Sequence, residues 1–123
     1  MCVANAGLSK FGPLVEQELE KIEQVLQTNV VGVVATVQAV APSMIERKSG
    51  TVVVVGSVSG AMITPYAGAY CASKASVTAI CDAMRMELAP FRVRVVEVVT
   101  GSIRSNFGAN ALAESKLPDG SRW

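Results

Sequence analysis

Thr51-Val52-Val53-Val54-Val55, directly after Gly50, is the stretch that decides the fold. A continuous apolar run of this length is typical of a strand that is covered on both faces, as the strands of parallel sheets are. Two further strands are predicted. One ends within residues 1–4, and the other is Val93-Arg94-Val95-Val96-Glu97-Val98-Val99.

Helical patterns lie between these strands. Apolar residues recur at helical spacing from about residue 16, and the pattern continues to about residue 49 as one long buried helix. Residues 69–88 predict a second helix, which ends before Pro90, and residues 107–116 predict a third. The order strand, helix, strand, helix, strand, helix predicts an α/β fold with right-handed crossovers and a doubly wound, Rossmann-like parallel sheet.

The composition favours one globular domain with a hydrophobic core. The chain has 123 residues, half of them hydrophobic and 17% charged, so residues 1–123 are expected to form one domain. The net charge is +1 without a basic block, which argues against nucleic-acid partners. The uncharged stretches 29–45 and 49–73 contain polar residues, and no secretory signal precedes them, so we expect no integral membrane span and a cytoplasmic location.

Histidine and cysteine usage narrows the chemistry further. The chain contains no histidine, which removes Ser-His-Asp catalysis and the usual zinc sites, so no metal site is expected. Its three cysteines form no CxxC pair and are expected to be free thiols in a reducing compartment.

Three polar clusters follow the three predicted strands: Asn5-Ala6-Gly7, Gly56-Ser57 and the segment from Gly101 to Ser105. In open α/β sheets, ligands bind beyond the carboxyl ends of the strands. The three loops therefore predict one site at one edge of the sheet.

Tyr70 and Lys74 add the reactive groups to this site. They are four residues apart on one predicted helix and so share a face. A lysine ammonium near a phenol favours the phenolate, which makes tyrosine a usable acid or base. Ser57, at the end of a strand, is placed to hold a substrate oxygen beside the phenol. The three residues predict proton donation to a carbonyl.

The motifs, taken together, resemble the short-chain dehydrogenase/reductases. The order and spacing match that family over essentially the whole chain, in Asn5-Ala6-Gly7, Asn29, Gly56-Ser57-Val58-Ser59-Gly60, Tyr70-Cys71-Ala72-Ser73-Lys74 and Thr100-Gly101-Ser102-Ile103-Arg104-Ser105. The resemblance implies reduction of a carbonyl or oxidation of an alcohol, with hydride supplied by NAD(P)H.

The resemblance also implies a role for each matching residue. Tyr70 exchanges the proton, Ser57 positions the substrate oxygen, Lys74 tunes Tyr70 and holds the nicotinamide ribose, and Asn29 holds a water of the proton relay from a kink in the long helix. The implied cofactor contacts are Asn5 and Gly7 on the adenosine side, Tyr70, Lys74 and Gly101, and Ile103 with Ser105 on the carboxamide side.

The chain departs from the family pattern in four places. Ala4 stands where the family has a first asparagine, Thr100 replaces a proline and Ser105 replaces a threonine. The family's glycine-rich phosphate turn would precede Met1. The chain is therefore expected to be a partial domain with about strands 4 to 6, without the N-terminal βαβ half, unable to catalyse reduction by itself and poorly soluble or oligomeric through its bare strand edge.

Within the family, the tract 56–101 is most similar to the NADPH-dependent 1-acyldihydroxyacetone-phosphate reductases. This resemblance implies a lipid-type keto substrate, NADPH rather than NADH, and association with the endoplasmic reticulum or lipid droplets. The resemblance also implies a homodimer or higher oligomer, because the two long helices commonly pair across a dimer axis in the family.

Two other interpretations stay open. A truncated, non-catalytic member could act only by dimerisation through these helices. Alternatively, Gly56-Ser57-Val58-Ser59-Gly60 matches the G-x-S-x-G elbow of serine hydrolases with Ser59 as nucleophile, although the chain has no histidine to serve as base.

Overall fold

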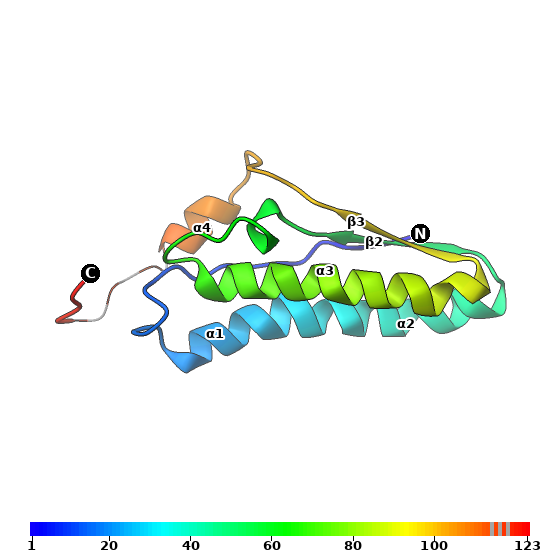
Figure 1. Ribbon diagram of the computed structural model, residues 1–123, viewed down its shortest axis with the longest axis horizontal. Helices are drawn as coiled ribbons and strands as arrows, with labels where there is room; N and C mark the ends of the chain where they lie inside the picture. Colours follow the sequence, from blue (N-terminus) through cyan, green and yellow to red (C-terminus); the bar gives the residue numbers. More distant parts are fainter. Residues whose placement is uncertain (114, 116, 118) are drawn as a thin grey trace.

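The computed structural model describes residues 1–113, 115, 117 and 119–123 and contains a three-stranded parallel sheet (Figure 1). The strands are β1 (Cys2–Ala4), β2 (Gly50–Val55) and β3 (Val93–Val98), in the order β1-β2-β3. In register, Val54 of β2 lies between Ala4 and Glu97. All three predicted strands are confirmed, and their carboxyl ends share one edge.

The helices alternate with the strands as predicted. The long helix consists of α1 (Leu19–Leu26), a π-helical turn (Gln27–Val31) and α2 (Gly32–Glu46), and the second is α3 (Gly68–Leu88). Short 3₁₀ turns cover Val58–Gly60 and Ala89–Phe91. The last helix, α4, spans Phe107–Ala113; the predicted end near residue 116 lies outside the described residues.

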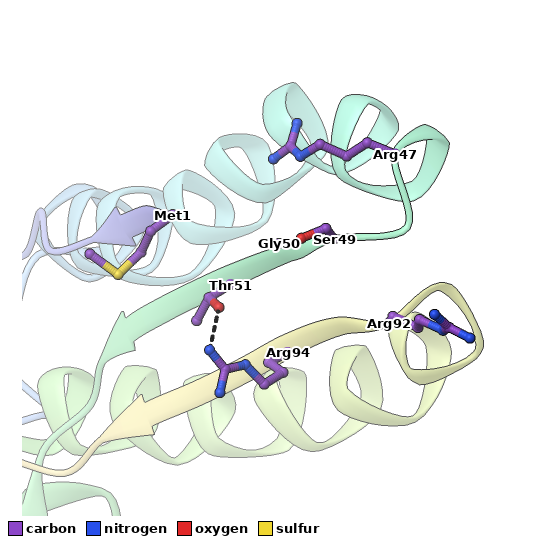
Figure 2. A pocket seen from close by; sticks show the side chains of 7 residues that line it. All are labelled: Met1, Arg47, Ser49, Gly50, Thr51, Arg92 and Arg94. Carbon is purple, nitrogen blue, oxygen red and sulfur yellow. Dashed lines mark hydrogen bonds between the residues drawn. The ribbon is translucent and has the colours of Figure 1, made fainter.

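The edge at which β2 and β3 begin carries three arginines around a hollow (Figure 2). Arg47 donates from Nη1 to Ser43 Oγ at 3.1 Å, and Arg94 donates from Nη2 to Thr51 Oγ1 at 3.2 Å. Figure 2 shows Arg47 lying back along α2 and Arg92 extending away from the strands. The three guanidinium groups do not converge, so this edge does not form a built anion site.

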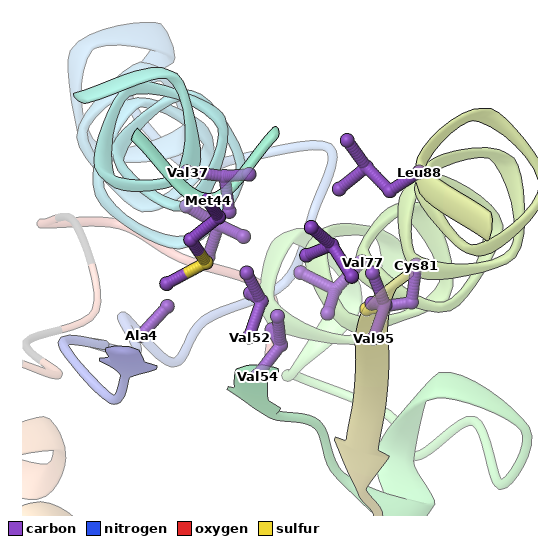
Figure 3. Close-up of a cluster of buried hydrophobic side chains, with 11 residues drawn as sticks. Ala4, Val37, Met44, Val52, Val54, Val77, Cys81, Leu88 and Val95 are labelled. Carbon is purple, nitrogen blue, oxygen red and sulfur yellow. The ribbon is translucent and has the colours of Figure 1, made fainter. Parts of the chain in front are cut away.

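The core lies between the sheet and one layer of helices (Figure 3). Val52 and Val54 of β2 are fully buried, and α2 and α3 pack over them. Burial of a valine side chain contributes about 1.5 kcal/mol or more. The core side chains labelled in Figure 3 are Ala4, Val37, Met44, Val52, Val54, Val77, Cys81, Leu88 and Val95.

The described sheet has the parallel strands and flanking helices of the predicted Rossmann-like fold, with three strands in chain order. Neighbouring strands are consecutive in the chain, and right-handed crossovers between consecutive parallel strands place their helices on the same face. Accordingly, α2 and α3 pack on one face of the three described strands. The other face of the sheet carries Val3, Val96 and Val98, all exposed in the described structure.

The continuous helical span Leu19–Glu46 is, by length and composition, apolar enough to cross a membrane. Core helices of soluble proteins meet the same criterion, and here Val33, Val37 and Met44 pack into the core. Only 22% of the most apolar window is buried within this chain. The expectation that the helix does not span a membrane therefore stays a prediction.

Candidate active site

Ser57 lies at the carboxyl edge, two residues beyond the end of β2. Its Oγ accepts a hydrogen bond from the N–H of Ser59 at 3.1 Å and so caps the turn Val58–Gly60. Gly60 lets this turn approach α3 closely, because a Cβ at residue 60 would lie 3.1 Å from the carbonyl of Lys74. The turn therefore sets Ser57 beside the first half of α3.

Tyr70 and Lys74 are brought together on α3. The Nζ of Lys74 lies 5.8 Å from the centroid of the Tyr70 ring. The same ammonium donates to the carbonyl oxygen of Val55, at the end of β2, at 2.8 Å. Lys74 is only 6% exposed, so its position is set by contacts rather than by solvent. The structure therefore places Tyr70 and Lys74 next to each other at the strand edge.

Two opposing effects act on the pKa of Lys74. Burial, which is the larger effect, lowers the pKa of Lys74 below its usual 10.5, and the carboxylate of Glu97 opposes this by stabilising the ammonium. The net result is a lowered pKa for Lys74. A lysine with a lowered pKa at a polar strand edge is a common feature of functional sites.

Asn29 lies in the π-helical turn of the long helix and is 1% exposed. Its Nδ2 donates to the carbonyl oxygen of Leu8 and to Ser73 Oγ, both at 2.9 Å, and its Oδ1 accepts from the N–H of Leu8 at 2.9 Å. Ser73 Oγ in turn donates to the carbonyl of Tyr70 at 2.7 Å. Both amide hydrogens of Asn29 are therefore occupied by protein groups, and the side chain ties the loop after β1 to α3.

Gly7 lies in the loop after β1, beside this tie. A Cβ at residue 7 would lie 3.5 Å from Asn29 Oδ1 and 4.0 Å from Lys74 Nζ. Asn5 is at the end of the same strand and is exposed. The structure thus brings Gly7 to Lys74, whereas Asn5 faces solvent.

Gly101, Ile103 and Ser105 are all exposed in the segment after β3. Ser105 Oγ accepts from the N–H of Phe107 at 3.3 Å. The Phe107 ring lies 5.5 Å from the Tyr70 ring, tilted by 51°. The contact between Phe107 and Tyr70 therefore joins the segment after β3 to the other predicted site residues.

Three residues that lie at this edge were assigned no role from the sequence. Ser73 and Glu97 connect to Lys74 and Tyr70 through hydrogen bonds and charge, and Phe107 covers the Tyr70 ring. A signal existed for Glu97, since it is the one carboxylate in an apolar strand and shares the face of Val93 and Val95. Ser73 and Phe107 had no comparable signal.

The serine hydrolase interpretation gains no support from this geometry. Ser59 lies in a 3₁₀ turn, and its N–H donates to Ser57 Oγ. A nucleophile elbow requires a base beside the serine, and the sequence has no histidine. The edge is built around Lys74 instead.

Comparison with known proteins bears on this geometry. Residues 1–116 match the family model described as short chain dehydrogenase. The chain is 40% identical over 122 residues to the short-chain dehydrogenase cctT of Talaromyces islandicus, covering 98% of this chain and 43% of that protein. It is also 40% identical over 105 residues to human 17-beta-hydroxysteroid dehydrogenase type 1, covering 85% of this chain and 32% of that protein.

A solved structure agrees in fold. The short-chain dehydrogenase from Sphingobium yanoikuyae in complex with NADPH superposes with a TM-score of 0.83 at 29% identity, covering 89% of this chain and 43% of that chain. This chain therefore spans less than half the length of the relatives that it matches. Its three-stranded sheet, its site motifs and the family match lead to one conclusion: the chain belongs to the short-chain dehydrogenase family.

Proposed function

We propose that this protein takes part in NAD(P)(H)-dependent reduction of a carbonyl compound, or oxidation of the corresponding alcohol, with Tyr70 as the proton-exchanging group. The observation that carries the proposal is the Lys74 ammonium, which is held by the carbonyl of Val55 at 2.8 Å and lies 5.8 Å from the Tyr70 ring. Family membership supports the reaction class.

The proton that the substrate oxygen receives would come from this chain's own residues. Tyr70 would donate its phenolic proton to the developing alkoxide, and the Lys74 ammonium lies 5.8 Å from the centre of its ring. Ser57, at the adjacent strand end, orients the substrate oxygen. Phe107, in contact with the Tyr70 ring, helps to keep water from the phenol on that side. Asn29 acts through the tie that it makes between Leu8 and Ser73.

The residues present fit the nicotinamide ribose of the cofactor. Lys74 uses one of its three N–H donors on Val55, and Gly7 has no side chain to fill the space near Nζ. Lys74 and Tyr70 would hold the ribose, and Ile103 and Ser105 would lie by the carboxamide. The cofactor supplies the hydride when bound. NADPH is favoured over NADH because a structural relative is solved with NADPH.

The substrate proposed is a hydrophobic ketone or secondary alcohol. One relative is named for 17-beta-hydroxysteroids, which are apolar alcohols. The narrower assignment, 1-acyldihydroxyacetone phosphate, rests on the sequence resemblance alone, and none of the relatives compared above carries that name. Exposed apolar residues after β3, such as Ile103 and Leu112, suit an apolar substrate.

We also propose that the protein is a homodimer through α2 and α3. The outer faces of both helices expose small residues, which allow close helix contact: Ala35, Ala39, Ala72, Ala75 and Ala79. Sedimentation analysis of the wild type and of a variant with Ala75→Glu tests this. A monomeric wild type would contradict the proposal.

The function is tested with a chimera. The matched segment of human 17-beta-hydroxysteroid dehydrogenase type 1 is replaced by the corresponding residues of this chain, and nicotinamide absorbance is followed with steroid, aromatic and aliphatic substrates. Tyr70→Phe is expected to lower kcat by about 10²- to 10⁴-fold, because general acid–base catalysis contributes that much. Tyr66→Phe is the matched control, since Tyr66 is half exposed and its ring contacts Trp123 instead.

The proposal requires that Tyr70→Phe loses turnover while its cofactor binding, measured by nicotinamide fluorescence, is nearly unchanged. A Tyr70→Phe chimera as fast as its parent would contradict it. So would a chimera that unfolds with the parent's cooperativity but turns over none of the substrates.

A further inference from the structure

Glu97 is a carboxylate on the helix-covered face of the sheet. Val93, Val95 and Glu97 alternate along β3 toward α3, and the two valines are buried. A carboxylate placed among apolar residues costs free energy unless partners compensate for its lost hydration. Glu97 itself is partly exposed, and the structure provides it with partners.

The carboxylate is held from two sides. Thr78 of α3 donates from Oγ1 to Glu97 Oε1 at 2.8 Å. On the other side lies Gly56, where a Cβ would be 2.3 Å from Glu97 Oε1. The carboxylate thus occupies the space that a side chain at residue 56 would fill. Gly56 and Thr78 together fix the position of Glu97.

The end of β2 and helix α3, which hold Glu97, also hold Lys74. On β2, Val55 accepts the Lys74 hydrogen bond, and Gly56 is the next residue. On α3, Thr78 lies one turn beyond Lys74, and its Oγ1 is 3.3 Å from the Lys74 carbonyl oxygen. The Lys74 ammonium thus lies against Val55 and the Glu97 carboxylate against Gly56, the next residue along the chain. Within the described structure, the two charged groups are neighbours there without forming a direct ion pair.

Resting on the reductase function proposed above, we propose that Glu97 is a positioning residue for that reaction. Its carboxylate, held by Thr78 over Gly56, stabilises the Lys74 ammonium next to Tyr70. In this proposal, Glu97 acts through Lys74 and not by contact with the substrate or the cofactor.

The other described groups around Lys74 cannot stabilise its ammonium as the carboxylate of Glu97 does. The loop after β1 contributes Gly7 and the π-helical turn contributes Asn29, both uncharged. From α3 itself, Tyr70 contributes a phenol. Farther along α3 lie the Cys81 thiol and the exposed pair of Asp82 with Arg85. Glu97 is the carboxylate that raises the pKa of Lys74, against the lowering effect of burial.

The test is a titration of Lys74 in the protein without cofactor. The five lysines are labelled with ¹³C at Cε, and the signal of Lys74 is identified by its loss in Lys74→Arg. Glu97→Gln keeps the size of the side chain and an oxygen that can accept from Thr78, so the fold is retained. Its Lys74 midpoint is expected at lower pH than in the wild type. Asp82→Asn, the matched control on α3, is expected to leave the midpoint unchanged.

A second variant separates the effect of the Glu97 charge from the effect of its hydrogen bond with Thr78. Thr78→Val removes the hydrogen bond but leaves the carboxylate, and a smaller downward shift than in Glu97→Gln is expected. In the chimera, Glu97→Gln is expected to move the high-pH limb of the kcat/KM profile to lower pH, since Lys74 then loses its proton earlier.

The two proposals fail in different ways. An unchanged Lys74 midpoint in Glu97→Gln, or a shift equal to that of Asp82→Asn, overturns the role of Glu97 and leaves the proposed function intact. A chimera that lacks turnover contradicts the proposed function, while the titration still measures whether Glu97 stabilises the ammonium.

Discussion

The carboxyl edge of the sheet has two sides that are built differently. On one side, Lys74, Asn29 and Ser73 are buried and joined to the strands and loops by hydrogen bonds of 2.8–2.9 Å. On the other side, residues 101–107 are exposed, and Gly101 has no neighbouring atom within 4 Å of a built Cβ. The difference indicates that Lys74, Asn29 and Ser73 are held in place by contacts within this chain, whereas residues 101–107 have few contacts among the described residues.

The largest effect is expected on the buried side. Lys74→Ala removes the ammonium that holds Val55 and faces Tyr70, and kcat/KM of the chimera is expected to fall by about 10²-fold or more. Ile103→Ala, on the exposed side, is expected to raise the KM for the cofactor by only a few-fold (about one lost apolar contact). Lys48→Ala is the control, because Lys48 is exposed and lies just before the start of β2, at the edge of the sheet opposite the site.

Steady-state kinetics of the three variants check this order. The comparison between the two sides breaks if Ile103→Ala is as damaging as Lys74→Ala, because the exposed segment would then be as important to turnover as the buried one.

The next effect is on stability. Asn29→Ala removes three hydrogen bonds and leaves the N–H and C=O of Leu8 without their partner. The free energy of unfolding is expected to fall by about 2–4 kcal/mol, since each unpaired buried group costs about 1–3 kcal/mol and part of the loop relaxes into water. Gln27→Ala, an exposed residue of the same π-helical turn, is expected to change it by less than about 0.5 kcal/mol.

Urea denaturation at several protein concentrations measures both variants. A double-mutant cycle with Ser73→Ala isolates the bond between Asn29 and Ser73. Equal stability of Asn29→Ala and wild type would mean that the side-chain tie has no structural role and that the implied water-holding role is the better explanation.

The strands and helices could be predicted because their signals are local. The valine run at 51–55 and the helical spacing at 69–88 each specify a periodicity within a few residues, and both elements are confirmed to within one residue at each end. The pairing of Tyr70 with Lys74 was equally accessible, since four residues make about one helical turn. These predictions required no knowledge of which elements meet in space.

The remaining features depend on residues far apart in the chain. Asn29 bonds to Ser73 across 44 positions, and Thr78 bonds to Glu97 across 19. Neither pair leaves a periodic signal. The π-helical turn was anticipated only as a kink implied by the family resemblance. The face that the helices cover follows from strand order, which the hydrophobic pattern does not encode.

Glycine substitutions sharpen the comparison at smaller scale. A Cβ at Gly60 would lie 3.1 Å from the carbonyl of Lys74, which belongs to the backbone of α3 and cannot move independently. Gly60→Ala is therefore expected to lower the free energy of unfolding by about 1–3 kcal/mol. Gly101→Ala meets no atom within 4 Å and is expected to be within about 0.5 kcal/mol of wild type.

Thermal unfolding of both glycine variants measures this difference. If Gly101→Ala were the more damaging of the two, residues 101–107 would be packed more tightly than their exposure indicates, and the distinction between the two sides would fail.

The smallest expected effect is the pH dependence that buried groups give to the free energy of unfolding. Burial, with a contribution from Glu97, raises the pKa of the Cys81 thiol from 9.0 to about 11. Between these values the folded protein keeps the thiol proton while the unfolded chain loses it, so the free energy of unfolding falls as pH rises. Lys74 acts in the opposite sense, because its pKa is lowered and its buried charge is relieved as pH rises.

Cys81→Ala separates the two groups. It removes the thiol and keeps Lys74, so the difference between wild type and variant reports Cys81 alone. Urea denaturation at pH 8 and pH 10 is expected to show a loss in wild type, relative to Cys81→Ala, on the order of 1 kcal/mol, since one pKa unit corresponds to about 1.4 kcal/mol. Parallel pH profiles of the two proteins would show that the thiol titrates alike in the folded and unfolded chains, and that this part of α3 is open to water.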